Sequence, residues 1–153
     1  MLMPGSDYTH IIDKLPYAPP FLFVDGLTSL DPQRVEGYYR FRAESDFYQG
    51  HFKEDPVTPG VLLTECCAQI GLVCLGIHLH EKTGSGSEIA RLALTEAQME
   101  FLEPVYPGET VRVEGQRVYF RFGKLKCAVR LYNEHGVLAC RGTISGMFLK
   151  AAE

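Results

Sequence analysis

A long apolar segment limits the fold of this chain more than any other feature of the sequence. Residues Val61 to Leu79 are largely apolar over 19 positions, close to the ~20 that a helix needs to cross a bilayer. However, Glu65 and Gln69 lie inside this segment, where a lone carboxylate is costly in lipid, and no basic cluster flanks it. We therefore expect a helix buried in the core of a soluble domain, with no membrane contact.

Runs of residues typical of strands lie on both sides of this helix. They are Phe21–Leu30 and Val35–Glu44 before it, and Ile89–Leu102, Glu109–Phe122, Lys124–Asn133 and Val137–Leu149 after it. The gaps between the later runs hold Pro104 and Pro107-Gly108, then Gly123, then Glu134-His135-Gly136, a spacing typical of hairpins. We also expect a short helix over Asp7–Leu15 and a loop at Gly84–Ser87.

The order of these elements favours an α+β fold, because the alternation of strand and helix that builds a parallel sheet is absent. A curved antiparallel sheet wrapped about the central helix would bury it, with a second subunit over the remaining exposed face. The length predicts one domain over residues 1–153.

Charge and cysteine content exclude several classes of function. The net charge of −4 does not support nucleic-acid binding, although residues 110–150 carry eight basic and two acidic side chains, a local charge of +6. The five cysteines contain no C-x-x-C pair, so neither a disulfide framework nor a zinc site is expected. The N-terminus does not resemble a secretory signal, and we expect a cytoplasmic protein.

Residues 48–69 hold the groups best suited to catalysis. His51 lies beside Gly50 in a predicted loop, where a ligand can reach its imidazole, although a structural histidine fits the same pattern. Glu65 interrupts an apolar helix, and burial would raise its pKa unless a partner compensates. Gln69, four residues further on, shares a helix face with Glu65 and is a suitable partner; the alternative is that this pair only satisfies itself in the core.

Gly60 follows Pro59 at the expected helix start, where a free backbone N–H and the helix dipole offer a site for an oxyanion. The alternative is that this Pro-Gly pair only forms a turn. We interpret Cys66 and Cys67 as core residues, and His78-x-His80 lacks a third metal ligand, so no metal and no cofactor are expected. A base, an acid and an oxyanion donor together suit removal of a proton beside a carbonyl and loss of a β-substituent.

The sequence resembles the (3R)-hydroxyacyl-acyl-carrier-protein dehydratases of the FabZ type. The resemblance covers Leu15–Asp25, Gln49–Phe52, Pro56, Pro59–Leu62, Glu65 and Ala68-Gln69, and more loosely Phe101–Glu109. It implies the hot-dog fold, a long helix wrapped by an antiparallel sheet, and a substrate carried on phosphopantetheine. It departs at Tyr17, where the family usually has histidine, and at Lys53-Glu54-Asp55.

The resemblance also implies roles for individual residues. His51 and Glu65 correspond to the catalytic pair, with His51 removing the C2 proton and Glu65 helping the C3 hydroxyl to leave. Gly60 corresponds to the glycine whose N–H binds the thioester carbonyl, and Gln69 and Val57 are expected to contact substrate. In this family the histidine and the glutamate of one active site come from different subunits, and the resemblance implies the same arrangement here.

An acidic acyl carrier protein is the partner implied, and Arg121, Lys124 and Lys126 in the basic region are candidates for docking it; a solvated strand face is the alternative. We expect a homodimer or larger oligomer, or a heterodimer with a homologue. Two alternative functions remain: a hot-dog acyl-thioester hydrolase, and a non-catalytic acyl-binding subunit of a heteromeric dehydratase.

Overall fold

The computed structural model describes residues 8–83 and 91–149, and the architecture is α+β, as predicted. A short helix, α1 (Thr9–Asp13), comes first, followed by the strands β1 (Gly26–Leu30) and β2 (Arg34–Arg40) and the 3-10 turn η1 (Asp46–Gln49). The central helix consists of α2 (Gly60–Ala68), the π-helical segment η2 (Gln69–Val73) and α3 (Cys74–Lys82). The remaining strands are β3 (Leu92–Phe101), β4 (Thr110–Arg121), β5 (Lys124–Tyr132) and β6 (Leu138–Phe148).

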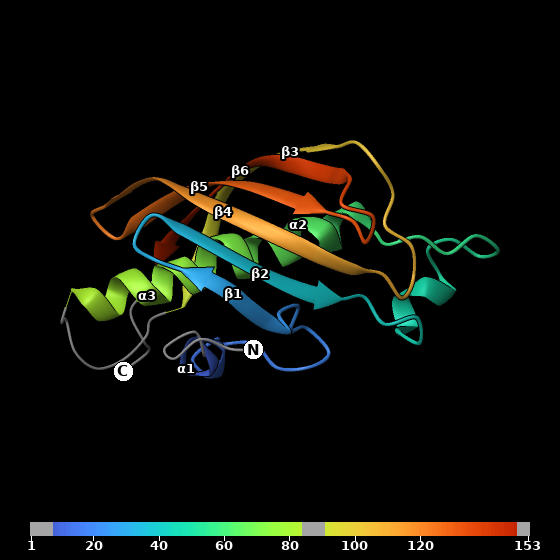
Figure 1. The fold of residues 1–153 in the computed structure, drawn as a ribbon, viewed down its shortest axis with the longest axis horizontal. Coiled ribbons are helices and arrows are strands. Elements are labelled where there is room, and N and C mark those ends of the chain that lie inside the picture. The colour runs from blue at the N-terminus through green and yellow to red at the C-terminus, as the bar shows by residue number, and fades with distance from the viewer. Residues whose placement is uncertain (1–7, 84–90, 150–153) are drawn as a thin grey trace.

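All six strands form one antiparallel sheet in the order β1-β2-β4-β5-β6-β3. The sheet curves over the central helix, which runs along its concave side from α2 to α3, with α3 at the left of the view (Figure 1). This is the hot-dog arrangement that the sequence implied. The loop expected at Gly84–Ser87 lies outside the described residues.

The central helix packs on the sheet most closely at two glycines. A Cβ atom on Gly115 of β4 would lie 2.3 Å from the backbone oxygen of Gly71 in η2, so only hydrogen fits between the two backbones. In the apolar stretch of the helix, 72% is buried inside the protein. Helix Gly60–Lys82 is long and apolar enough to span a membrane, but here it is the core helix that the sequence predicts.

The strand predicted over Phe21–Leu30 begins only at Gly26. Residues 21–25 run as an irregular segment, because the Phe23 N–H donates to the side chain of Gln69 over 2.8 Å and not to a neighbouring strand. The upstream prolines, Pro19 and Pro20, also lack the N–H that a ladder requires.

The hairpin predicted between the third and fourth strands is wrong. β3 pairs with β6 at the far edge of the sheet, and β4 pairs with β2 and β5. The connecting residues cross the start of the central helix, where Thr58 donates its N–H to the Val105 carbonyl over 2.9 Å. The prolines were therefore a correct signal for a break in the sheet, and the partner of β3 is set by contacts distant in sequence.

Candidate active site

Glu65 lies half-buried on α2, where a single fully buried side chain fixes its orientation. Gln69 donates from Nε2 to Glu65 Oε2 over 3.0 Å and to the Phe21 carbonyl over 3.1 Å. Its Oε1 accepts the Phe23 N–H over 2.8 Å. Both amide hydrogens of Gln69 are thus committed, and the expected hydrogen bond between Gln69 and Glu65 is present. Within the described residues, Glu65 Oε1 accepts no hydrogen bond.

Burial has the larger effect on the acidity of this carboxyl group. It raises the pKa of Glu65 above the usual value, and the hydrogen bond from Gln69 lowers it by a smaller amount. The sequence predicted this opposition between burial and a compensating partner without deciding it. The net shift is upward, so at a given pH a larger fraction of Glu65 is protonated than of an exposed glutamate.

Tyr17 belongs to the surroundings of Glu65, although the sequence marked it only as a departure from the family pattern. Burial raises the pKa of Tyr17 to about 12, and the charges of Glu65 and Cys74 add to the shift. Its ring lies 6.3 Å from that of Phe21, whose carbonyl binds Gln69. The phenol therefore stays protonated at neutral pH.

His51 lies half-buried in the loop after η1, and its ring is anchored by the backbone. Nδ1 lies 2.8 Å from the carbonyl of Val57, whose own N–H donates back to the His51 carbonyl over 3.0 Å. A carbonyl only accepts, so we assign the hydrogen of the neutral ring to Nδ1 and the free lone pair to Nε2. Val57, predicted to contact substrate, holds the His51 ring by its main chain.

Gly60 begins α2, and its backbone N–H is unused within the described part of the chain. The N–H groups of Leu62 and Leu63 both donate to the carbonyl of Pro59, which closes the first turn around it. A Cβ atom on Gly60 would lie 3.2 Å from the Phe101 ring, so this position is crowded from the β3 side. A free donor at a helix N-terminus suits a developing negative charge.

The predicted site residues therefore form two groups. Gly60, Glu65 and Gln69 share the start of the central helix, whereas His51 and Val57 share the loop that precedes it. No hydrogen bond or ion pair joins His51 to Glu65 among residues 8–83 and 91–149. We refer to these two groups of one chain below as its two half-sites.

The basic residues Arg121, Lys124 and Lys126 lie around the turn between β4 and β5. Leu125 packs near Gly76 of α3, so this turn lies at the end of the central helix opposite Gly60 (Figure 1). Arg121 stacks on the Tyr119 ring at 4.4 Å, and none of the three basic groups forms an ion pair within the described residues.

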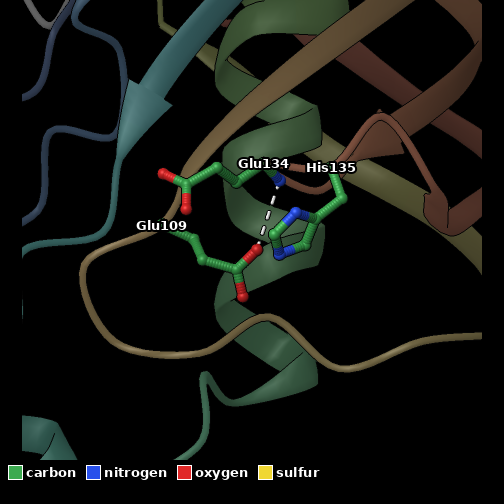
Figure 2. Close-up of side chains that lie close together, drawn as sticks. All are labelled: Glu109, Glu134 and His135. Atoms are coloured by element: carbon green, nitrogen blue, oxygen red, sulfur yellow. Dashed lines mark hydrogen bonds between the residues drawn. The ribbon is translucent and has the colours of Figure 1, made fainter.

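A cluster of Glu109, Glu134 and His135 brings three potential metal ligands within 4.8 Å of one another (Figure 2). The buried Glu109 carboxylate already accepts the N–H of Tyr106 over 2.6 Å and the N–H of Glu134 over 3.2 Å. Its two oxygens tie the segment after β3 to the turn between β5 and β6, which is a structural role.

Comparison with known proteins gives one consistent family. The FabA-like domain matches residues 15–133 of this chain. A 3-hydroxyacyl-[acyl-carrier-protein] dehydratase FabZ from Geotalea uraniireducens is 31% identical over 96% of this chain and 99% of that protein. A FabZ from Thermus thermophilus is 36% identical over 81% of this chain and 84% of that protein.

Solved structures agree on the fold. A chain of the dehydratase heterocomplex ApeI:P from Xenorhabdus doucetiae has a TM-score of 0.75 at 13% identity, with 91% of each chain covered. A hypothetical thioesterase with coenzyme A from Streptococcus pneumoniae has a TM-score of 0.56 at 14% identity, covering 83% of this chain and 87% of that one. The fold, the match to the family and the two FabZ relatives lead to one conclusion: this chain belongs to the FabA-like family and to its FabZ-type branch.

Proposed function

We propose that this protein is a 3-hydroxyacyl-[acyl-carrier-protein] dehydratase, which converts a 3-hydroxyacyl thioester into the trans-2-enoyl thioester and water in fatty-acid or related polyene or polyketide synthesis. The observation that carries the proposal is Glu65, a half-buried acid with one oxygen held by Gln69 and the other free of hydrogen bonds within the described residues. Its FabZ-type relatives carry this activity in their names.

The chemistry divides between the two half-sites. His51 takes the C2 proton through Nε2, because Val57 holds the hydrogen of the neutral ring on Nδ1. The Gly60 N–H stabilises the oxygen of the thioester as negative charge develops on it, an effect of roughly 10²–10³ in rate at similar sites. Glu65 acts on the C3 hydroxyl through Oε1, and one proton, given by Glu65 or returned by protonated His51, lets that hydroxyl leave as water; the proton taken from C2 then restores the pair. No metal and no cofactor take part in this scheme.

We propose that a second copy completes each site. β3 pairs only with β6 among the described strands, so its other edge is open, and it carries exposed apolar side chains at Leu94 and Phe101. A two-fold copy that pairs antiparallel along this edge extends the sheet and sets the two central helices side by side. His51 of one subunit then works with Glu65 of the other; a homologous chain in place of the copy gives a heterodimer.

The same symmetry supports carrier docking at Arg121, Lys124 and Lys126. An antiparallel copy reverses the direction of its helix, so the basic turn of one subunit lies at the end where the helix of its partner begins. An acidic acyl carrier protein bound there delivers its arm toward the partner's Gly60 end. Reversing Arg121 and Lys124 to Glu should raise KM for the carrier-bound substrate and not for a small thioester; equal effects on both would contradict docking.

The direct test follows enoyl absorbance and free thiol together, with a short 3-hydroxyacyl thioester on carrier protein. Wild type should form enoyl product, and Glu65→Gln should lose roughly 10²–10⁴ of the rate. Glu134→Gln, which removes an exposed charge, is the matched control. Thiol release without enoyl product would indicate a thioesterase, and a silent wild type would indicate a non-catalytic subunit or a missing partner.

A mixing experiment tests the shared site. His51→Ala and Glu65→Ala should each be inactive alone, and mixed subunits should regain activity because one site of each mixed dimer holds both groups. If the subunits exchange and activity still does not recover, both residues act within one chain.

We further propose that the protein works in the cytoplasm. All five cysteines are free and buried, as suits a reducing compartment, and Cys66 and Cys67 are core residues with no exposed surface.

A further inference from the structure

A cavity of about 740 Å³ lies beside the candidate active site, and neither His51 nor Glu65 lines it. Its walls are residues 19–25 on one side and Arg42 with residues 44–47 on the other, and Tyr39 and Leu62 complete the lining. A space of this size is in the range that proteins use for small molecules.

Both walls connect directly to the half-sites. Leu62 precedes Glu65 by three positions and shares its helix face, and the backbone of Phe21 and Phe23 binds the Gln69 side chain that holds Glu65. On the opposite wall, the carbonyl of Phe47 accepts the His51 N–H over 3.1 Å. A molecule in this cavity therefore lies between the segment that supports Glu65 and the loop that carries His51 of the same chain.

The lining is aromatic and its rings are set at right angles. The Phe21 and Phe23 rings lie edge to face at 5.1 Å, and Phe23 meets Tyr39 in the same way at 5.5 Å. Phe47 adds a fourth ring from the opposite wall. Edges and faces of this kind interact favourably with a further flat ring or conjugated system, beyond the gain from burying apolar area.

The charges around the cavity are mainly negative. Asp25, Glu44 and Asp46 belong to the lining, and Arg42, its one basic member, is already paired with Asp25 over 3.1 Å. This balance disfavours a phosphate, so the phosphopantetheine arm enters elsewhere and the cavity is left for an uncharged group.

From the aromatic walls, the acidic rim and the position beside the segment that supports Glu65, we infer that this cavity holds the far end of the acyl chain and prefers a planar aromatic or conjugated end to a saturated one of equal length. The inference rests on the proposed function, which makes an acyl thioester the ligand.

A matched pair of substrates tests the preference. The pantetheine thioesters of 3-hydroxy-5-phenylpentanoate and 3-hydroxy-5-cyclohexylpentanoate have the same length and differ only in the aromaticity of the ring. Wild type should show a higher kcat/KM for the phenyl substrate, by about 2- to 12-fold for each aromatic contact made. Equal values for the two substrates would overturn the inference.

Variants assign the preference to this cavity. Phe47→Leu and Phe21→Leu each remove one ring and should lower the phenyl-to-cyclohexyl ratio toward one; Phe21 is 47% exposed, so its change is the milder for folding. Phe122→Leu is the control, because this ring is 95% exposed at the turn between β4 and β5. A ratio unchanged in both cavity variants would show that the selectivity arises elsewhere.

A binding measurement separates this inference from the proposed reaction. The 5-phenylpentanoyl and 5-cyclohexylpentanoyl thioesters of pantetheine lack the hydroxyl and cannot be dehydrated, so calorimetry reports only their affinities. Tighter phenyl binding that depends on Phe47, in a protein that dehydrates nothing, would support the cavity and contradict the dehydratase. Dehydration of both hydroxy substrates with equal efficiency would support the dehydratase and contradict the preference assigned to the cavity.

Discussion

Gln69 donates one amide hydrogen to Oε2 of Glu65 over 3.0 Å, and this bond determines which oxygen of the acid is available for chemistry. Because the Gln69 N–H already points at Oε2, the acidic proton of a protonated Glu65 is placed on Oε1. The same amide group holds the segment that contains Phe21 and Phe23. One buried side chain thus links the acid to the wall of the neighbouring cavity.

Gln69→Leu should therefore affect both activity and folding. It removes the bond that lowers the pKa of Glu65, so the pH at which the acid loses its proton should rise, and the basic limb of the kcat profile should move upward with it. It also leaves the Phe23 N–H without a partner, at a cost of about 1–3 kcal/mol in the free energy of unfolding. Gln116→Leu on β4 is the exposed control, and a pH profile that stays in place would contradict the role of Gln69.

Glu65→Gln should make the protein more stable at neutral pH. Burial raises the pKa of Glu65 in the folded state above its unfolded value, so its stabilising contribution is complete below the unfolded pKa and is lost as pH rises through the folded pKa. The neutral amide does not lose a proton, and its Tm should exceed that of wild type at neutral pH but not in acid. Calorimetry at both pH values checks this; a Tm difference independent of pH would mean that ionisation of Glu65 is not its source.

The His51 ring should be held in one tautomer. The Val57 carbonyl lies 2.8 Å from Nδ1 and can only accept a hydrogen bond. Nitrogen NMR of the uncharged His51 ring should therefore show a protonated Nδ1 and an unprotonated Nε2. His135, which is exposed, provides the reference for a ring in solvent. The opposite tautomer at His51 would remove Nε2 as the base.

Gly60→Ala should lower activity more than stability. The added methyl group would meet the Phe101 ring at 3.2 Å, and that ring is 50% exposed and able to move away. We expect kcat/KM to fall by about tenfold with little change in Tm, since helix starts tolerate alanine. The double variant with Phe101→Leu should regain activity; no recovery would show that the added methyl group acts on the Gly60 N–H and not through the Phe101 ring.

Gly115→Ala should do the opposite and destabilise the fold. Its methyl group would lie 2.3 Å from the backbone oxygen of Gly71, and neither backbone can give way without moving the helix on the sheet. Overpacking of this kind costs about 3 kcal/mol in the free energy of unfolding. Gly50→Ala, with no atom within 4 Å of the added methyl group, is the control for denaturant titration. Equal midpoints for the two variants would contradict a tight crossing.

Local patterns were sufficient to predict the central helix, the later strands and the pairing of Glu65 with Gln69, because each depends on periodicity or on residues one turn apart. The place of β3 could not be predicted in this way, since two other strands separate it from its partner β6 along the chain and only the complete sheet decides the pairing. The bonds from Gln69 to Phe21 and Phe23 span 48 and 46 positions and leave no trace in local sequence. The places of His51 in its loop and of Glu65 on α2 likewise depend on how whole elements are arranged.

The π-helical segment Gln69–Val73 has a consequence for how this helix can be changed. A π-helical turn contains about one residue more than an α-helical turn, so deletion of one residue here would restore α-helical winding and leave the Glu65 half and the Gly76 half in nearly the same relative orientation. The same deletion within α2 or α3 would rotate one half against the other by about 100°. This segment is therefore the place where the helix can change its length by one residue with the least rotation of the Glu65 side chain.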